Sequence, residues 1–171
     1  GIINLSNAVV KTVNGINFTL NSNSINYNIG MVAGANNGTI FGNYKGKESL
    51  NEIVFNVIAK FNITTIEFDN APNIYVGAVA GTSTNKVENI LATGAIEIAY
   101  TGSISPAGSL GGLVGFASGT ISTVATIGLD LTSNIADVYA GGIAGTSSAD
   151  ISNAKVISAE TTSDIGTTYG E

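Results

Sequence analysis

The stretch that decides the fold is Gly30–Tyr44, with the sequence GMVAGANNGTIFGNY. Its first five residues follow a pattern of Gly, any residue, a branched apolar residue, Ala or Val, and Gly. The pattern occurs four times, and an aliphatic residue follows each first Gly at the same offset of ten residues. The copies are Gly30–Gly34, Gly77–Gly81, Gly111–Gly115 and Gly141–Gly145, and the aliphatic residues are Ile40, Val87, Ile121 and Ile151. Because the offset is constant although the copies are unequally spaced, the sequence is a repeat array.

The composition is that of a folded domain with few charges. The chain has 171 residues, of which 44% are hydrophobic and 11% charged, against a usual charged fraction of roughly 25%. This balance excludes a disordered chain. The net charge is −6 and there is no Arg, so the basic stripe that nucleic acid binding requires is missing. No apolar run approaches the roughly 20 residues that span a bilayer, and no signal peptide pattern is present. We therefore expect no nucleic acid partner and no membrane insertion.

The residue types needed for most catalysis are missing. The chain has no Cys, His or Arg, which excludes disulfides, Ser–His–Asp and Cys–His catalysis, and zinc sites of His or Cys. Glu67 and Asp69 lie two residues apart, which would put them on one strand face as the paired carboxylates of a glycosidase. With Asn70 they would instead bind Ca²⁺ weakly. A solvated strand edge is the favoured interpretation, because catalytic carboxylates need supporting partners and a cleft. We expect no catalytic, cofactor or metal site.

The segments between the copies read as strands. Phe55, Val57, Ala59, Phe61 and Ile63 alternate with residues that are mostly polar, which is a strand pattern. Together with the residues up to Asn73 they predict two strands and a turn, inserted in the first full repeat so that Lys47–Asn73 decorates one side. Ala95–Tyr100 and Gly128–Leu131 predict shorter strands at the matching place. No window shows a helical period, so no helix is expected.

Small residues on both faces of each Gly block bury little area alone, and Gly allows another backbone to come close. Interpreted as a strand, each block would therefore stack on the same strand of the next copy. Two apolar columns would result, one of Val32, Val79, Leu113 and Ile143 and one of Ile40, Val87, Ile121 and Ile151. Positive φ is expected in the polar turns after each block. The predicted fold is all-β: a parallel β-helix-like solenoid of four recognisable repeats, a partial N-terminal repeat, and a longer β insert in the first full repeat.

The two ends suggest a cut array. Leu5-Ser-Asn-Ala resembles Ile151-Ser-Asn-Ala, which places Leu5 at the fixed aliphatic position, and Tyr169-Gly170 resembles Tyr139-Ala140. We expect residues 1–171 to be a single solenoid domain and a segment of a longer array. The alternative is a natural end with atypical capping repeats.

The repeats resemble the GLUG-type repeat, with Gly38-Thr39-Ile40 and Gly119-Thr120-Ile121 following the Gly blocks. The sequence departs from that pattern at Lys86-Val87 and Asp150-Ile151, where Thr is absent. Such repeats occur mainly in large bacterial surface and secreted proteins, including adhesins and non-catalytic parts of secreted proteases. The resemblance implies an extracellular or cell-surface location and no catalytic residue.

Three hypotheses of function remain. The first is a non-catalytic structural and binding segment of a long surface protein, an adhesin-like stalk. The second is a self-assembling extracellular filament, or a phage or viral fibre subunit, and the third is a carbohydrate-active enzyme. Expected partners are neighbouring repeats, identical subunits end to end, and surface glycans or host proteins. No cofactor is expected.

Further features bear on binding. Tyr27, Tyr75 and Tyr139 precede Gly blocks and are either sugar-stacking platforms or, as favoured, packing residues. Ice binding would need unbroken ranks of Thr, which the ninth repeat position lacks. That position holds Thr39, Lys86, Thr120 and Asp150, and the glycosylation acceptor pattern occurs at Asn4, Asn17, Asn37 and Asn62.

Overall fold

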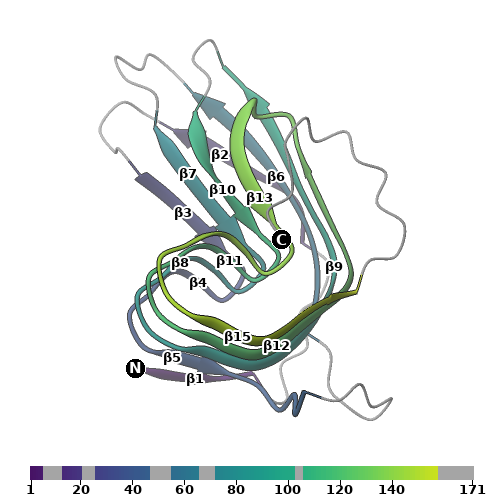
Figure 1. The fold of residues 1–171 in the computed structure, drawn as a ribbon. Helices are drawn as coiled ribbons and strands as arrows, with labels where there is room; N and C mark the ends of the chain where they lie inside the picture. Colours follow the sequence, from purple (N-terminus) through teal and green to yellow (C-terminus); the bar gives the residue numbers. More distant parts are fainter. Residues whose placement is uncertain (6–12, 21–25, 47–54, 66–71, 103–105, 158–171) are drawn as a thin grey trace.

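The protein is described by a computed structural model for residues 1–5, 13–20, 26–46, 55–65, 72–102 and 106–157. In these residues the regular structure consists of β-strands, and every strand pairing is parallel. The strands form three sheets that the chain visits in turn, as Figure 1 shows. The predicted all-β solenoid is confirmed.

We name the sheets by their place in each repeat. The leading sheet consists of β3 (Asn26–Gly30), β7 (Asn73–Gly77), β10 (Ala107–Gly111) and β13 (Asp137–Gly141). The short sheet consists of β4 (Ala33–Asn36), β8 (Ala80–Ser83), β11 (Val114–Ala117) and β14 (Ala144–Ser147). The long sheet contains β1 (Ile2–Asn4), β5 (Thr39–Phe41), β9 (Val87–Thr101), β12 (Ile121–Ser133) and β15 (Ile151–Ile157), with β2 (Val13–Leu20) and β6 (Phe55–Thr65) beside β9.

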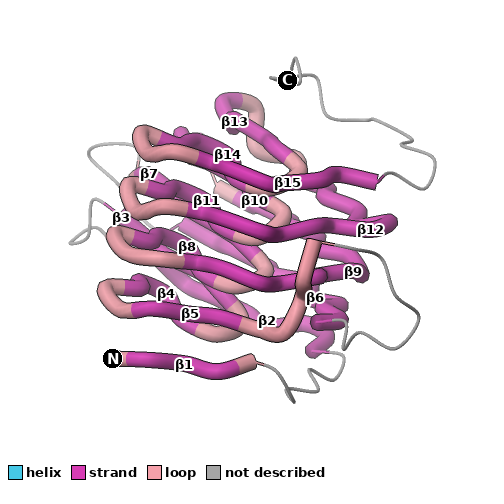
Figure 2. The backbone as a smooth tube through the Cα atoms, turned by 60° about the horizontal axis from the view of Figure 1, so that its bottom comes forward, coloured by secondary structure: helices cyan, strands magenta, loops and turns pink. Residues whose placement is uncertain are grey.

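Each of the four repeats contributes one coil, which runs from the leading sheet through the short sheet to the long sheet. Figure 2 shows the coils stacked, with β5, β9, β12 and β15 lying one above another. The segment after β5 crosses the outside of this stack, where the buried Tyr44 packs against Leu91 and Ala125. One coil cannot enclose a core, so the stacking supplies it.

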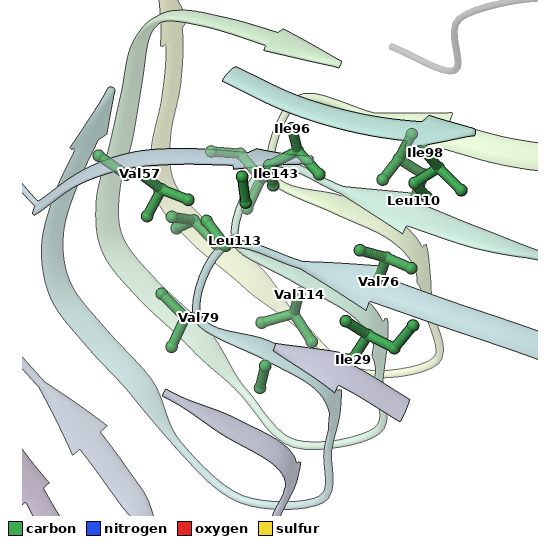
Figure 3. Packing of buried hydrophobic residues seen from close by; sticks show 14 of the residues in the cluster. Ile29, Val57, Val76, Val79, Ile96, Ile98, Leu110, Leu113, Val114 and Ile143 are labelled. Carbon is green, nitrogen blue, oxygen red and sulfur yellow. The ribbon is translucent and has the colours of Figure 1, made fainter. Parts of the chain in front are cut away.

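Both predicted apolar columns are confirmed. The backbone N–H of Val79 donates to the Leu113 carbonyl at 2.8 Å, and that of Leu113 donates to Ile143 at 2.8 Å. Val32 joins the same column through a 3.1 Å bond to Val79. In the long sheet the second column pairs in register, in the order Ile40, Val87, Ile121 and Ile151. Figure 3 shows Val79, Leu113 and Ile143 in the core that the three sheets enclose.

The Gly blocks are corners, and their interpretation as single strands was wrong. β7 ends at Gly77, the chain bends at Ala78 and Val79, and β8 begins at Ala80, with the same division in every repeat. A Cβ atom added at Gly77 would collide with the Ala80 carbonyl of its own corner and with the Leu113 carbonyl of the next coil. The first Gly is therefore needed because the corner folds back on itself.

The second Gly of the block lies against the leading sheet of the preceding coil. A Cβ atom at Gly115 would lie 2.5 Å from the Val76 nitrogen and 2.6 Å from the Gly81 oxygen. Gly81 and Gly145 meet Ile29 and Leu110 in the same way. The close backbone approach expected for these glycines is real, but it joins two different sheets.

The predicted insert is partly core. β6 lies between β2 and β9 in the long sheet, and its residues Phe55 to Thr64 pair in register with Ala92 to Thr101. The alternation is confirmed, but the inward side chains are buried beneath the leading sheet. These side chains are Phe55, Val57, Ala59, Phe61 and Ile63. The interpretation of all of Lys47–Asn73 as decoration was therefore wrong, because the second half of β9 needs a paired neighbour. The second predicted strand, around Ile66–Phe68, lies outside the described residues.

The other two predicted strands are parts of longer ones. Ala95–Tyr100 lies in β9 and Gly128–Leu131 lies in β12, and the two strands pair with a register shift between Thr126 and Leu129. They are continuous with the strands that carry Val87 and Ile121. The partial N-terminal repeat and the first full repeat have separate strands in the long sheet instead, β1 with β2 and β5 with β6.

The partial N-terminal repeat is confirmed, but with a different residue in the aliphatic column. Ile3 of β1 pairs with Ile40, so Ile3 takes the position assigned to Leu5. The Leu5 N–H donates to the Phe41 carbonyl at 2.6 Å, beyond the column. The short similarity between residues 5–8 and 151–154 was misleading, because alternation alone leaves strand register open in steps of two.

Positive φ occurs in a column of the long sheet. Asn89, Thr123 and Asn153 have φ values of 58°, 52° and 50°, and the pairings on either side of them place them opposite one another. Among the described residues, none of those in the polar turns after the Gly blocks has positive φ. The prediction of positive φ in the polar turns was therefore wrong, since positive φ occurs within the long sheet instead.

Thr123 is the strained member of this column, since a β-branched residue is disfavoured at positive φ and Asn tolerates it. Thr123→Asn should raise the free energy of unfolding by about 1 kcal/mol. Urea unfolding followed by circular dichroism measures the change. Thr120→Asn, at an exposed position without positive φ, is the matched control. A gain no larger than that of the control would contradict the assignment of strain.

Candidate binding surface

The outer face of the leading sheet is the candidate site. Alternate residues of its strands point inward, where Ile29, Ile74, Val76, Leu110 and Val138 are buried. The intervening residues lie on the opposite side of the sheet, which we call the leading face. It consists of Asn26, Asn28, Asn73, Tyr75, Ala107, Ser109, Asp137 and Tyr139. The short sheet covers part of this face, so Ser109 is 4% exposed and Tyr75 is half-buried.

The register arranges the leading face in two columns that run along the solenoid. One column holds Asn28, Tyr75, Ser109 and Tyr139, and the other holds Asn26, Asn73, Ala107 and Asp137. Successive residues in a column are roughly 4.8 Å apart, the usual distance between paired strands. Two Tyr side chains in one column are thus separated by one Ser.

The two aromatic residues of the leading face differ in exposure. Tyr139 is 73% exposed. Tyr75 is half-buried because its ring meets Phe116 of the short sheet, with ring centroids 5.7 Å apart and an interplanar angle of 48°. Such a tilted pair fixes the Tyr75 ring in place.

Polar contacts order the rest of the face. The Asn73 side-chain amide donates to the Asn26 oxygen at 3.0 Å. The hydroxyls of Ser109 and Thr146 are 2.7 Å apart, which joins the leading sheet to the short sheet. A side-chain amide has two donor hydrogens and an acceptor oxygen, so the Asn pair retains hydrogen-bonding capacity toward a ligand.

Charge is sparse here. Asp137 is the charged residue among the described members of the leading face. An ion pair elsewhere joins Lys60 of β6 to Glu97 of β9 at 2.6 Å, and both side chains are 45% exposed. An exposed pair of this kind contributes at most about 1 kcal/mol to the free energy of unfolding. It joins two strands of the long sheet and is not part of the leading face.

The three Tyr candidates fall in different places. Tyr27 is on the inner face and packs half-buried against the core, and Tyr75 packs on Phe116, so the favoured packing interpretation is confirmed for these two. It is wrong for Tyr139, which is exposed. Tyr75 and Tyr139 each lie two residues before the first Gly of a block, so the repeat register itself aligns them in one column. The alternation of polar and apolar residues in Asn26–Gly30 and Asn73–Gly77 was the pattern from which the Asn26–Asn73 pair could have been predicted.

The carboxylate candidates stay predictions. Glu67, Asp69 and Asn70 lie outside the described residues, and among those described no three His, Cys, Asp or Glu side chains gather as metal ligands. Within the same residues, no helix has the length and apolar composition needed to cross a membrane.

The remaining surface features can also be placed. Asn37 is exposed after β4, Asn62 is half-buried in β6, and Asn4 and Asn17 lie in β1 and β2. The ninth repeat positions follow one another along the stack. Their carbonyls and the neighbouring amides link Ile40 to Lys86, Val87 to Thr120 and Ile121 to Asp150. Their mixed chemistry leaves no rank of Thr for ice binding.

Comparison with protein-family models, with curated proteins and with solved structures finds no match to this chain. The resemblance to the GLUG-type repeat therefore stays a prediction that depends on the Gly blocks and the Gly-Thr-Ile tripeptides.

Proposed function

We propose that the chain is a non-catalytic structural and binding segment of an extracellular or cell-surface protein, an adhesin-like stalk. The observation that carries this proposal is the hydrogen-bonded ladder that links all four coils through all three sheets. Each added coil lengthens such a stack by roughly 4.8 Å without changing its cross-section. A solenoid of this kind is a spacer whose length is set by the number of repeats.

The use of the repeated residues supports the same proposal. The Gly residues make the corners and the aliphatic residues fill the core. The residues that recur in each repeat therefore serve to stack the coils. Some residues that differ between repeats, such as Asn28 and Tyr139, are exposed. A binding role is therefore assigned to the variable outer positions.

A second candidate is a self-assembling filament. The favouring observation is the exposed last coil, where β15 carries Ile151 at 40% and Val156 at 57% exposure, and Ile2 at the other end is 77% exposed. Among the described residues, β1 and β15 each pair on one side only. Strand edges with apolar side chains favour pairing with a further strand.

Immunogold electron microscopy on intact cells of the producing organism tests both candidates. A surface stalk should carry label on the unpermeabilised envelope, with an antibody against a cytoplasmic enzyme as the negative control. Label along detached fibres of uniform width would favour the filament. Label that appears only after permeabilisation would contradict both.

A further inference from the structure

We propose that residues 42–46, which we call the strap, tie the first coil to the third, so that the first three coils open together instead of one by one. The strap consists of Gly42, Asn43, Tyr44, Lys45 and Gly46, and the three coils are those of β5, β9 and β12. This inference goes beyond the proposed function, because it concerns how the stack opens and holds for any ligand or location.

The strap begins in the ladder of the long sheet and then leaves the first coil. After β5 ends at Phe41, the Gly42 N–H donates to the Glu88 carbonyl at 3.1 Å and the Tyr44 N–H donates to the Asn89 carbonyl at 2.9 Å. Both acceptors belong to β9 of the second coil. At the equivalent place in the second and third coils the chain continues as a strand, but in the first coil it crosses the outside of the stack from β9 towards β12 (Figure 2).

The side chain of Tyr44 is buried against both later coils. Tyr44 is 1% exposed and forms a small apolar cluster with Leu91 of the second coil and Ala125 of the third, against which Ile127 also packs. This cluster shares no residue with the main core. The strap therefore joins three successive coils through a contact that is separate from the core.

Two glycines shape the ends of the strap. A Cβ atom added at Gly42 would lie 2.5 Å from the Asn89 oxygen, so a Gly at this position lets the strap lie close on β9. Gly46 has a φ of 75°, which residues with a side chain rarely adopt. A Cβ atom at Gly46 would lie 3.7 Å from Cγ2 of Thr123 on β12. The strap thus starts on the second coil and ends beside the third.

The strap changes how the solenoid opens. In a stack of repeats each coil normally contacts only its neighbours, so a coil at an end can detach by itself. Here the first coil cannot leave the second while Tyr44 stays buried against Ala125 of the third. Opening of the junction between the first and second coils is therefore linked to opening of the junction between the second and third. In the proposed stalk this link would keep the coils together under a load along the stack.

Native-state hydrogen exchange of the whole chain tests the link, because it measures how often each backbone N–H is released from its hydrogen bond. The N–H groups of Val32 and Ile40 donate across the junction between the first and second coils, and those of Val79 and Val87 donate across the next junction. In the parent we expect one shared opening constant for both junctions. In Tyr44→Ala the first junction should open roughly tenfold more often than the second, or more, because a buried aromatic ring is lost.

Tyr27→Ala is the matched control, since it removes a Tyr of the first coil that packs half-buried against the core and leaves the strap intact. Both junctions should then open more often by the same factor. Tyr44→Phe should behave as the parent does because the ring remains. Tyr44→Leu fills part of the site and should separate the two junctions by a smaller factor, which keeps the test valid even when Tyr44→Ala does not fold.

A shared opening constant in both Tyr44→Ala and Tyr44→Leu would overturn the proposal. So would separate opening constants in the parent or in Tyr27→Ala. None of these results would affect the surface labelling that tests the stalk, so the strap and the stalk can fail separately.

Discussion

Gly115→Ala should destabilise the solenoid by at least about 3 kcal/mol, the upper part of the range for overpacking a close-packed interior. The added Cβ atom would lie 2.5 Å from the Val76 nitrogen, 2.6 Å from the Gly81 oxygen and 2.8 Å from the Tyr75 carbonyl carbon. All three are backbone atoms held in strand ladders, so no flexible side chain can move aside. Relief requires that the short sheet and the leading sheet separate, and the core lies directly behind them. Urea unfolding followed by circular dichroism measures the loss.

Gly34→Ala is the matched control, since Gly34 is the second Gly of the first repeat. Its added Cβ atom would meet one close backbone atom, the Asn28 oxygen at 2.9 Å, and the next neighbour is 3.8 Å away. The chain can relax there by a small shift, so we expect a loss of about 1 kcal/mol, near the average for a point mutation. Equal losses in the two variants would show that the contact between sheets is not the reason for the second Gly.

The repeat offset was enough to predict the stack and both apolar columns, because residues in equivalent positions must pair when coils are in register. It was not enough to find the corner. Small residues on both sides of a short run fit a tight strand and a tight bend equally well, and the difference at Ala78 and Val79 depends on the sheets that meet there. The register of the first strand was likewise decided by pairing with Ile40, which no local pattern records.

The candidate surface was likewise predicted only in part. The sequence drew attention to Tyr75 and Tyr139, and their common position two residues before a Gly block is enough to place them in one column. Their different exposure could not be predicted in this way. Phe116 was not considered at all, since it follows a Gly block in a stretch interpreted as a polar turn. Its contact with Tyr75 exists because the short sheet folds back on the leading sheet.

Phe61→Ala should lower the free energy of unfolding by about 3–5 kcal/mol, the usual loss for removing a buried aromatic ring. Phe61 is 1% exposed, and β6 pairs it with Ile98 on one side and Ile16 on the other. The cavity would lie on the inner side of β6, which is paired on both edges. The paired backbones restrict the movement that would fill the cavity. The melting temperature and the urea midpoint should both fall.

Ile58→Ala on the same strand is the matched control. It distinguishes the loss of a buried side chain from a general effect of substitution in β6. Ile58 is 42% exposed, so its truncation should cost no more than about 0.5 kcal/mol, as at ordinary surface positions. Because both substitutions remove apolar atoms from one strand, they share any effect on strand propensity. Two small, similar losses would mean that the strand lies outside the cooperative unit and that Lys47–Asn73 decorates the solenoid after all. A large loss for Phe61 alone would mean that the first coil is closed by a strand that enters the ladder after an excursion. The sequence between Tyr44 and β6 would then be free to vary in length without changing the core.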